Sequence, residues 1–429
     1  MNLINFLKIA FRNLGRHKIK TILTVLAISI SVMLYIFVDG YAKGVSFETI
    51  RNLINYETGV AKIYSKKFYE KKDDLPLYEN FGNYDDILKK LESKNFVGSP
   101  RVVFKGSLIN NNEEFPFVFV GVNPEIEKKV LKYHNYIKEG TFIENGKYNI
   151  VLGYTGAKKL DVNVGDTVYL STVIDKKDDV GNVKHINQLI SLKVCGLIKS
   201  NDFVINSYMG FLPLDILQDD TGLLLEEKIT EIVIRKKDAK ESDWITKEES
   251  VSNIKNILGK SVRDDLVLIS YEEDAKEASA INNANNTFYN VVVLFLSLLA
   301  IFGISNTILI ATMQRTTEIG MLRALGLIEK DILILFGMEA GLIGFIGSLI
   351  GIFFGILINI YMVNYGFDFS YILEQGNFDN IRTVIFKSMW NFPNIILAGI
   401  VASLISSLVA IPPTIRALKT SIIDALNFD

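Results

Sequence analysis

The sequence has few of the residues that build disulfides, metal sites or nucleophilic catalysis. It contains one cysteine and three histidines in 429 residues. A single cysteine excludes an intrachain disulfide, and we expect Cys195 to serve as a small buried hydrophobe. The histidines, at positions 17, 134 and 185, lack metal-ligand spacing, and the sequence holds no H-E-x-x-H or G-x-S-x-G motif. We therefore predict no catalytic residue, no metal site and no cofactor bound by this chain.

The sequence also gives little indication of nucleotide or nucleic-acid binding. Gly259-Lys260-Ser261 matches the end of a phosphate-binding P-loop, but that motif requires a glycine where Ile254 stands. The formal net charge of -2 provides no general attraction to nucleic acid. We therefore predict that this chain binds neither a nucleotide nor nucleic acid.

The sequence does contain several long apolar runs. A membrane-spanning helix needs roughly 20 consecutive apolar residues. Four runs of this kind lie at 21–38, 288–313, 340–367 (preceded by the apolar stretch 332–338) and 393–415. The first could be a cleaved signal peptide, but it follows some 20 residues and is followed by Asp39-Gly40-Tyr41 rather than by a cleavage site. We predict four transmembrane helices.

The charges next to the first run predict its orientation. Lys8, Arg12, Arg16, Lys18 and Lys20 precede it, with no acidic residue among them. By the positive-inside rule, that end lies in the cytoplasm. Four spans return the C-terminus to the same side, so we predict a multi-pass protein of the cytoplasmic (inner) membrane with both termini in the cytoplasm.

The residues before the first run have the periodicity of an amphipathic helix. Leu3, Leu7, Ala10, Phe11 and Leu14 recur at helical spacing among polar and cationic residues. This pattern predicts a helix that lies in the membrane interface and contacts lipid headgroups. A helix packed on protein is the alternative.

The polar segment between the first and second runs is large enough for its own core. Strand-like runs occur at 115–122, 167–173, 189–198, 231–235 and 266–270, and helical stretches at 84–94 and 247–258. The predicted fold is an α-helical membrane bundle of four transmembrane helices with a large α+β extracytoplasmic domain inserted between the first two. The predicted segments are 1–20 interfacial helix, 21–40 first span, 41–286 outer domain, 287–312 second span, 313–331 cytoplasmic helix, 332–364 third span, 365–392 outer loop, 393–415 fourth span and 416–429 cytoplasmic tail.

Small residues recur at spacings of three and four in the third and fourth runs, a pattern that lets helix backbones approach closely. We predict close helix packing at Gly337, Gly341, Gly344, Gly347, Gly351, Gly355, Gly399, Ser403 and Ser407.

The segment 315–326 predicts a short helix that is apolar on both sides. At 100° per residue, Arg315, Ile319, Leu322, Arg323 and Gly326 share one side. Met321, Ala324, Leu325 and Ile328 share the other. This pattern suits a helix between the membrane bundle and a docked protein, or a helix on lipid headgroups.

A resemblance decides between these interpretations. Residues 303–327 read GISNTILIATMQRTTEIGMLRALGL, which resembles the signature of the MacB/FtsX/LolC-LolE superfamily of ABC transporter permeases (type VII). Weaker similarities lie in IAFRNLGRHKIKTILTVLAISI near the start, VLGYTGAKKLDVNVGDTVYL in the outer domain, and IPPTIRALKTSIIDAL at the end, where Ser421 replaces the usual proline. The resemblance implies a MacB-like periplasmic core domain and a coupling helix gripped by a cytoplasmic ATPase. The implied ATPase-coupling residues are Arg315, Thr316, Glu318, Ile319, Gly320, Leu322, Arg323, Ala324 and Gly326.

Two polar residues of the predicted spans are also expected to contribute to the structure or the coupling. The resemblance places Asn306 in the N-T pair that ends the second span. Glu339 lies about seven residues into the third helical stretch, where a carboxylate is costly and is by default functional or paired. We expect Glu339 to have a structural or coupling role on the cytoplasmic side.

The resemblance implies a non-catalytic permease subunit that moves its outer domain when a separate ATPase dimer, carrying ATP and magnesium, hydrolyses ATP. A second permease chain, identical or related, is the other expected partner. The large outer domain and the roughly 20 residues before the first span favour lipoprotein release of the LolC/LolE kind, with a lipoprotein and a periplasmic carrier as further partners. The alternatives are MacB-like export of a peptide, lipid or drug, and an FtsX-like regulator that transmits motion without transport.

Overall fold

The computed structural model describes residues 3–15, 18–111, 113–177, 183–218, 223, 227–237, 247–259, 263–375 and 383–420. The chain divides into two compact units. The bundle unit comprises Met1–Phe47, Asn283–Phe367 and Phe386–Asp429, and the sheet unit comprises Glu48–Asn282 and Asp368–Ile385.

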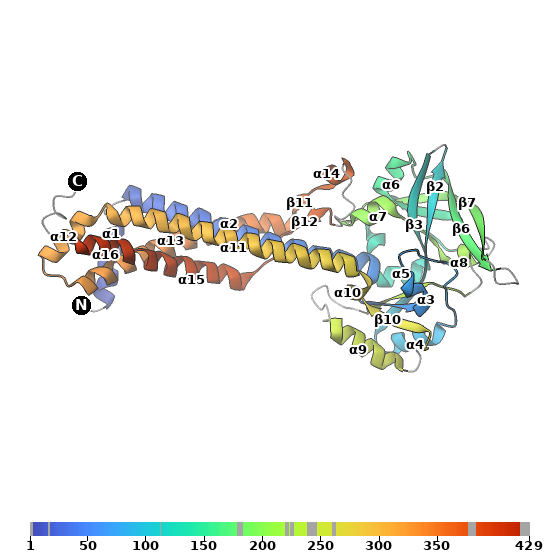
Figure 1. The fold of residues 1–429 in the computed structure, drawn as a ribbon. Helices are drawn as coiled ribbons and strands as arrows, with labels where there is room; N and C mark the ends of the chain where they lie inside the picture. The colour runs from blue at the N-terminus through green and yellow to red at the C-terminus, as the bar shows by residue number, and fades with distance from the viewer. Residues whose placement is uncertain are drawn as a thin grey trace. The chain divides into compact units, whose positions relative to one another are not determined.

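The bundle unit is entirely helical apart from short connections. Its helices are α1 (Leu3–Leu14), α2 (Lys18–Leu53, up to Phe47), α11 (Lys276–Met313, from Asn283), α12 (Thr316–Ala324), α13 (Glu329–Asn364), α15 (Phe392–Val409) and α16 (Ile411–Lys419). The described residues include four helical stretches long and apolar enough to cross a membrane: Thr21–Thr58, Asn283–Ala311, Glu329–Asn364 and Phe392–Lys419. Each of these candidate spans coincides with one of the four predicted transmembrane helices. The short helices α1, α12 and α16 lie at one end of the bundle (Figure 1).

The bundle has an apolar interior and an apolar exterior, as a bilayer requires. Ile28, Val32 and Ile36 of α2 are buried in one cluster with Ala340 of α13 and Ala402 of α15. Large side chains on the outside of α11, α13 and α15 stay exposed, among them Phe302, Phe353 and Leu404. The helix α2 continues past the apolar run that ends at residue 38, because no proline interrupts it before Leu53.

The sheet unit holds a mixed sheet. Its strands are β1 (Ala61–Ser65), β2 (Phe96–Asn110), β3 (Glu113–Val122), β4 (Ile137–Gly140), β5 (Asn149–Gly153), β6 (Thr167–Lys177), β7 (Val183–Ile198), β8 (Met209–Pro213), β9 (Glu231–Lys236) and β10 (Leu266–Ser270). The order is β10-β1-β9-β2-β3-β8-β5-β7-β4, and β6 pairs with β2 and β7. The β3–β8 and β5–β7 pairs are parallel, and the other pairs are antiparallel.

The rest of the sheet unit consists of helices and short turns. They are α3 (Lys66–Glu70), α4 (Asp85–Ser93), α5 (Pro124–Val130), α6 (Tyr154–Lys159), α7 (Phe203–Tyr208), α8 (Leu214–Gln218), α9 (Lys247–Leu258), α10 (Tyr271–Asp274), α14 (Ser370–Gln375) and the π- and 3-10-helical turns Ile54–Thr58 and Tyr133–Tyr136. The segment before the fourth span belongs to the sheet unit as well: Leu373 and Val384 are buried against Phe203. Two short strands, β11 (Phe367–Asp368) and β12 (Ile385–Phe386), pair with each other.

The five strand runs and two helical stretches predicted in the outer domain are all present, and the α+β class is confirmed. The long strand β2 was not predicted, because Gly98, Pro100 and Gly106 interrupt its apolar alternation. Lys260, Ser261 and Ser421, which bear on the P-loop and tail predictions, lie outside the described residues. Cys195 is half-buried, and burial raises the pKa of its thiol to about 11.

Candidate functional site

The helix α12 has well-defined ends. The Thr316 hydroxyl donates to the Met313 carbonyl over 2.7 Å at its start. At its end, Gly326 has φ +86°, the Gly326 amide donates to the Arg323 carbonyl, and the Leu327 amide donates to the Leu322 carbonyl. These two bonds form a Schellman motif, which favours glycine at the left-handed position. The segment from Arg315 to Gly326 thus forms a helix with defined ends.

One side of α12 packs against the bundle. Ile319 is fully buried in a cluster with Ile332 and Phe336 of α13 and Ala417 and Leu418 of α16. Thr316 and Gly320 are buried next to it. Apolar packing therefore holds α12 between α13 and α16.

A buried ionic cluster joins α12 to α13. The Arg315 guanidinium forms ion pairs with Glu339 and, over 2.7 Å, with Glu318. It also lies 4.9 Å from the centre of the Phe336 ring. Burial disfavours the charge of Arg315, but the two carboxylates outweigh it and raise the pKa of Arg315 above its usual value. Glu339 is thus paired, as a carboxylate at this depth is expected to be.

The N-terminal helix contacts the same carboxylate. The Asn13 amide donates to Glu339 Oε2 over 3.3 Å, and Ala10 is fully buried against Leu335 of α13. On the other side of α1, Phe11 is 68% exposed. The helix therefore packs on protein with one face, and its contact with lipid through the other remains a prediction.

Arg323 connects α12 to the end of α16. Its Nη1 donates to the Thr420 carbonyl over 2.7 Å. Thr420 is the C-cap of α16, where a cation offsets the negative end of the helix dipole. Arg315 and Arg323 thus fix the two ends of α12 to different helices.

The other side of α12 and the turn that follows it are apolar and exposed. Met321, Leu325 and Ile328 are 42%, 78% and 62% exposed, and Ala324 lies beside them. The structure therefore divides the predicted coupling residues: most face the bundle, and Met321, Leu325 and Ile328, which were not among them, form the free surface. Their common side in the helical projection was the signal that could have identified them.

The glycines of α13 allow close approach of two neighbouring helices. A Cβ atom on Gly344 would lie 2.5 Å from Ser406 Oγ of α15, and one on Gly341 would clash with Ser407. A Cβ atom on Gly351 would lie 2.6 Å from the Ser29 carbonyl of α2. The small-residue stripe thus serves packing within this chain.

The remaining small residues of α13 also face either α2 or α15. Gly347 faces Ile28 and Gly355 faces Ile36, both on α2, whereas Gly337 lies near the Ser407 carbonyl of α15. Other predicted residues lie on α15 or α11: Gly399 packs on Ile352, Ser403 donates to the Gly341 carbonyl over 3.0 Å, and Asn306 is exposed.

A polar cluster near the opposite end of the bundle was not predicted. Asp39 is buried and accepts hydrogen bonds from Asn391 and, over 2.8 Å, from Asn394. Ser388, which precedes Asn391 by three residues in the chain, donates a hydrogen bond to Asn359. A lone aspartate directly after an apolar run was the available signal, since such a carboxylate needs partners.

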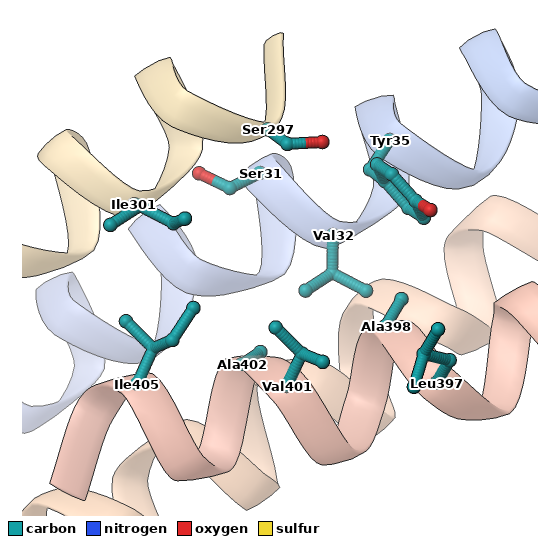
Figure 2. A pocket seen from close by; sticks show the side chains of 10 residues that line it. All are labelled: Ser31, Val32, Tyr35, Ser297, Ile301, Leu397, Ala398, Val401, Ala402 and Ile405. Carbon is teal, nitrogen blue, oxygen red and sulfur yellow. The ribbon is translucent and has the colours of Figure 1, made fainter. Parts of the chain in front are cut away.

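A small apolar cavity lies between α2, α11 and α15 (Figure 2). Its volume is about 140 Å³, and its lining includes Val32, Ile301 and Val401. Ser31 and Ser297 lie on facing helices in Figure 2, and each hydroxyl donates to a carbonyl of its own helix, over 2.9 and 2.7 Å. Because these donors are satisfied, the lining is mostly apolar, and Tyr35 adds the one other hydroxyl group among the lining residues.

Two models of known protein families match this chain, one in each half. Residues 21–247 match the family model for the MacB-like periplasmic core domain, and residues 290–422 match the model for the FtsX-like permease C-terminal region. An uncharacterized ABC transporter permease of Methanocaldococcus jannaschii is 29% identical over 83% of this chain and 84% of its own. The ABC transporter permease YtrF of Bacillus subtilis is 22% identical over 97% of each chain. The lipoprotein-releasing system transmembrane protein LolC of Neisseria meningitidis is 21% identical over 64% of each chain.

Proposed function

Because this chain belongs to the family of ABC transporter permeases with a MacB-like periplasmic core domain and an FtsX-like C-terminal region, we propose that it couples ATP hydrolysis on a separate ATPase to movement of the sheet unit. Relatives of this chain carry the name of ABC transporter permease. In this proposal, the chain is the non-catalytic membrane subunit, and ATP and magnesium bind the partner.

The observation that supports this proposal is that α12 is bonded to two other helices of the bundle. Its inner side is joined to α13 by Arg315 and Glu339 and to α16 by Arg323. Its outer side exposes Met321 and Leu325, and such apolar patches mark docking sites. A force applied to the outer side would therefore move α13 and α16 together with α12.

This role implies an orientation. The end of the bundle with α12 would lie in the cytoplasm, where an ATPase dimer can reach it. The sheet unit, formed by Glu48–Asn282 and Asp368–Ile385, would lie outside. The cationic residues before the first span agree with this orientation. A second permease chain would pair with this one, since two ATPase subunits present two docking sites.

For the substrate, we propose a lipoprotein that is released from the outer leaflet of the membrane. The cavity between α2, α11 and α15 supports this choice, since it is apolar and has a volume of about 140 Å³. An apolar pocket on the membrane-facing bundle suits a segment of an acyl chain rather than a charged headgroup. The LolC relative is named for lipoprotein release.

The test is to purify the chain with its ATPase in lipid nanodiscs and to identify bound molecules by native mass spectrometry. We expect an acylated protein to accompany the complex without nucleotide and to leave when ATP is added. Val401→Trp, which fills the cavity, should reduce the bound fraction, whereas Leu404→Trp on the outer face of α15 should not. A bound soluble drug or peptide, or a bound cell-wall enzyme with no acylated protein, would refute lipoprotein release in favour of export or regulation.

A further inference from the structure

The ring of Tyr154 lies among three lysines that come from three different segments of the sheet unit. Lys138 is on β4, Lys158 is on α6, and Lys199 directly follows β7. Their Nζ atoms lie 3.6, 4.7 and 5.6 Å from the centre of the Tyr154 ring. An ammonium group this close to an aromatic ring is attracted by it. Three positive charges therefore lie close together around one side chain.

A fourth lysine extends this group. Lys159 is the last residue of α6, and its Nζ lies 5.1 Å from the centre of the Phe115 ring and 5.5 Å from that of Tyr208. These two rings stack on each other with their centres 5.8 Å apart. We call the four residues the lysine cluster: Lys138, Lys158, Lys159 and Lys199. All four are exposed, so a ligand can reach them.

Carboxylates do not balance this charge. Among the described residues, no carboxylate forms an ion pair with Lys138, Lys158 or Lys159. Glu139 and Asp161, which stand next to them in the sequence, pair with none of the three. The lysine cluster therefore carries an excess of positive charge, which attracts anions.

The ionisation of Tyr154 responds to the same charges. Its interaction with Lys138, followed by that with Lys158, favours the ionised form and lowers the pKa of Tyr154 below its usual value. Burial acts in the opposite direction and is outweighed. The surroundings of the Tyr154 hydroxyl thus favour a negative charge, whether the tyrosine or a ligand carries it.

The chemistry of lysine selects among anions. An ammonium group is a point charge with three donors, whereas the planar fork of arginine, which matches a carboxylate, does not occur in the lysine cluster. A phosphate monoester carries about -1.5 to -2 charges at neutral pH and has three acceptor oxygens. It can therefore bond to two or three ammonium groups at once and offset most of their charge. A carboxylate would leave more of the positive charge unbalanced.

We propose that the lysine cluster binds a terminal phosphate group, which lies between Lys138 and Lys158 beside the ring of Tyr154. The phosphate oxygens accept hydrogen bonds from the two ammonium groups, and Lys199 adds to the attraction. Because the aromatic ring already holds the ammonium groups near one another, less side-chain freedom is lost on binding. A lipid headgroup and a free phosphate present the same oxygens and are the two possible sources. The site does not depend on the proposed function.

The experiment measures the acetylation rate of individual lysines on the full chain by mass spectrometry, in maltoside micelles and phosphate-free buffer. Inorganic phosphate should slow the acetylation of Lys138 and Lys158 in a saturable way. Lys128 is the internal control, because it also lies over a ring, 5.9 Å from the centre of Phe142, but is paired with Glu125 over 3.1 Å. Its rate should not change. Equal protection of Lys128, or equal protection by sodium chloride of the same ionic strength, would overturn the proposal.

A second arm identifies the source of the phosphate. The chain is placed in phosphatidylcholine nanodiscs with or without phosphatidic acid, whose headgroup ends in a phosphate monoester. Protection of Lys138 and Lys158 by phosphatidic acid, without added phosphate, assigns the site to a lipid headgroup. Protection by inorganic phosphate alone assigns it to a free phosphate. Protection by neither would overturn the proposal.

Two double variants locate the site by ³¹P NMR titration with inorganic phosphate. Lys138→Gln combined with Lys158→Gln should weaken binding about tenfold, because it removes two charged donors. Lys128→Gln combined with Lys129→Gln removes the same charge from exposed positions of α5 and should leave the affinity unchanged. Equal losses in the two variants would show a general effect of charge, and unchanged affinity in the first would place the phosphate elsewhere. Either result would refute the assignment.

Discussion

The ion pair between Arg315 and Glu339 is predicted to stabilise the junction of α12 and α13 by a measurable coupling energy. The two side chains are 13% and 6% exposed, so solvent screens the pair weakly. Breaking a fully buried pair costs about 3–5 kcal/mol. Here Glu339→Gln still leaves Arg315 paired with Glu318 over 2.7 Å, and the glutamine oxygen can accept one hydrogen bond. The loss is therefore closer to that of one charge-assisted hydrogen bond, about 1.5–3 kcal/mol.

A double-mutant cycle measures this coupling. Glu339→Gln, Arg315→Gln and the double variant are unfolded reversibly in mixed micelles, and the free energies of unfolding are compared. We expect the two substitutions to be non-additive by about 1–3 kcal/mol. The same variants, assembled with the ATPase, should hydrolyse ATP while releasing less substrate per ATP. Free energies that add within about 0.5 kcal/mol, or full ATP-dependent release by Glu339→Gln, would refute the coupling role.

Two further predictions concern packing and thiol reactivity. Gly351→Ala places a Cβ atom 2.6 Å from the Ser29 carbonyl and should lower the free energy of unfolding by about 1–3 kcal/mol, whereas the control Gly303→Ala, with no atom within 4 Å, should be neutral or stabilising. Equal effects at both positions in the same micelle assay would contradict the packing argument. Because burial raises the pKa of Cys195 to about 11, its alkylation by a maleimide at pH 7.5 should be about two orders of magnitude slower than that of a free thiol, rising about tenfold per pH unit up to pH 10. A rate that levels off near pH 8.5 would show an unperturbed thiol.

The sequence was sufficient for the elements whose signal is local. Length and hydropathy determine the four spans, and strand periodicity located β3 and β10. The helix α12 was predictable because its apolar positions lie within one short segment, whereas its coupling role was implied only by the family resemblance. In each case, the information lies within a few turns of the chain.

Features that depend on contacts between distant segments were not predictable. Asp39 meets Asn391 and Asn394 more than 350 residues away, and no local pattern marks this pairing. The order of the strands requires the same long-range information, since β9 lies between β1 and β2. The direction of each α13 glycine toward α2 or α15 depends on the neighbouring helices rather than on the stripe itself.

The most direct test of the central claim is to map which side of α12 contacts the ATPase. In a Cys195→Ser background, a benzophenone is attached to Leu325→Cys on the exposed side of α12, or to Leu349→Cys on the outer face of α13, and the assembled complex is irradiated. Leu325 and Leu349 are 78% and 50% exposed, so both sites are accessible to the label. We predict that the ATPase is cross-linked from position 325 and not from position 349. An assembled complex with no ATPase adduct at position 325 would contradict the claim that α12 receives the force of ATP hydrolysis.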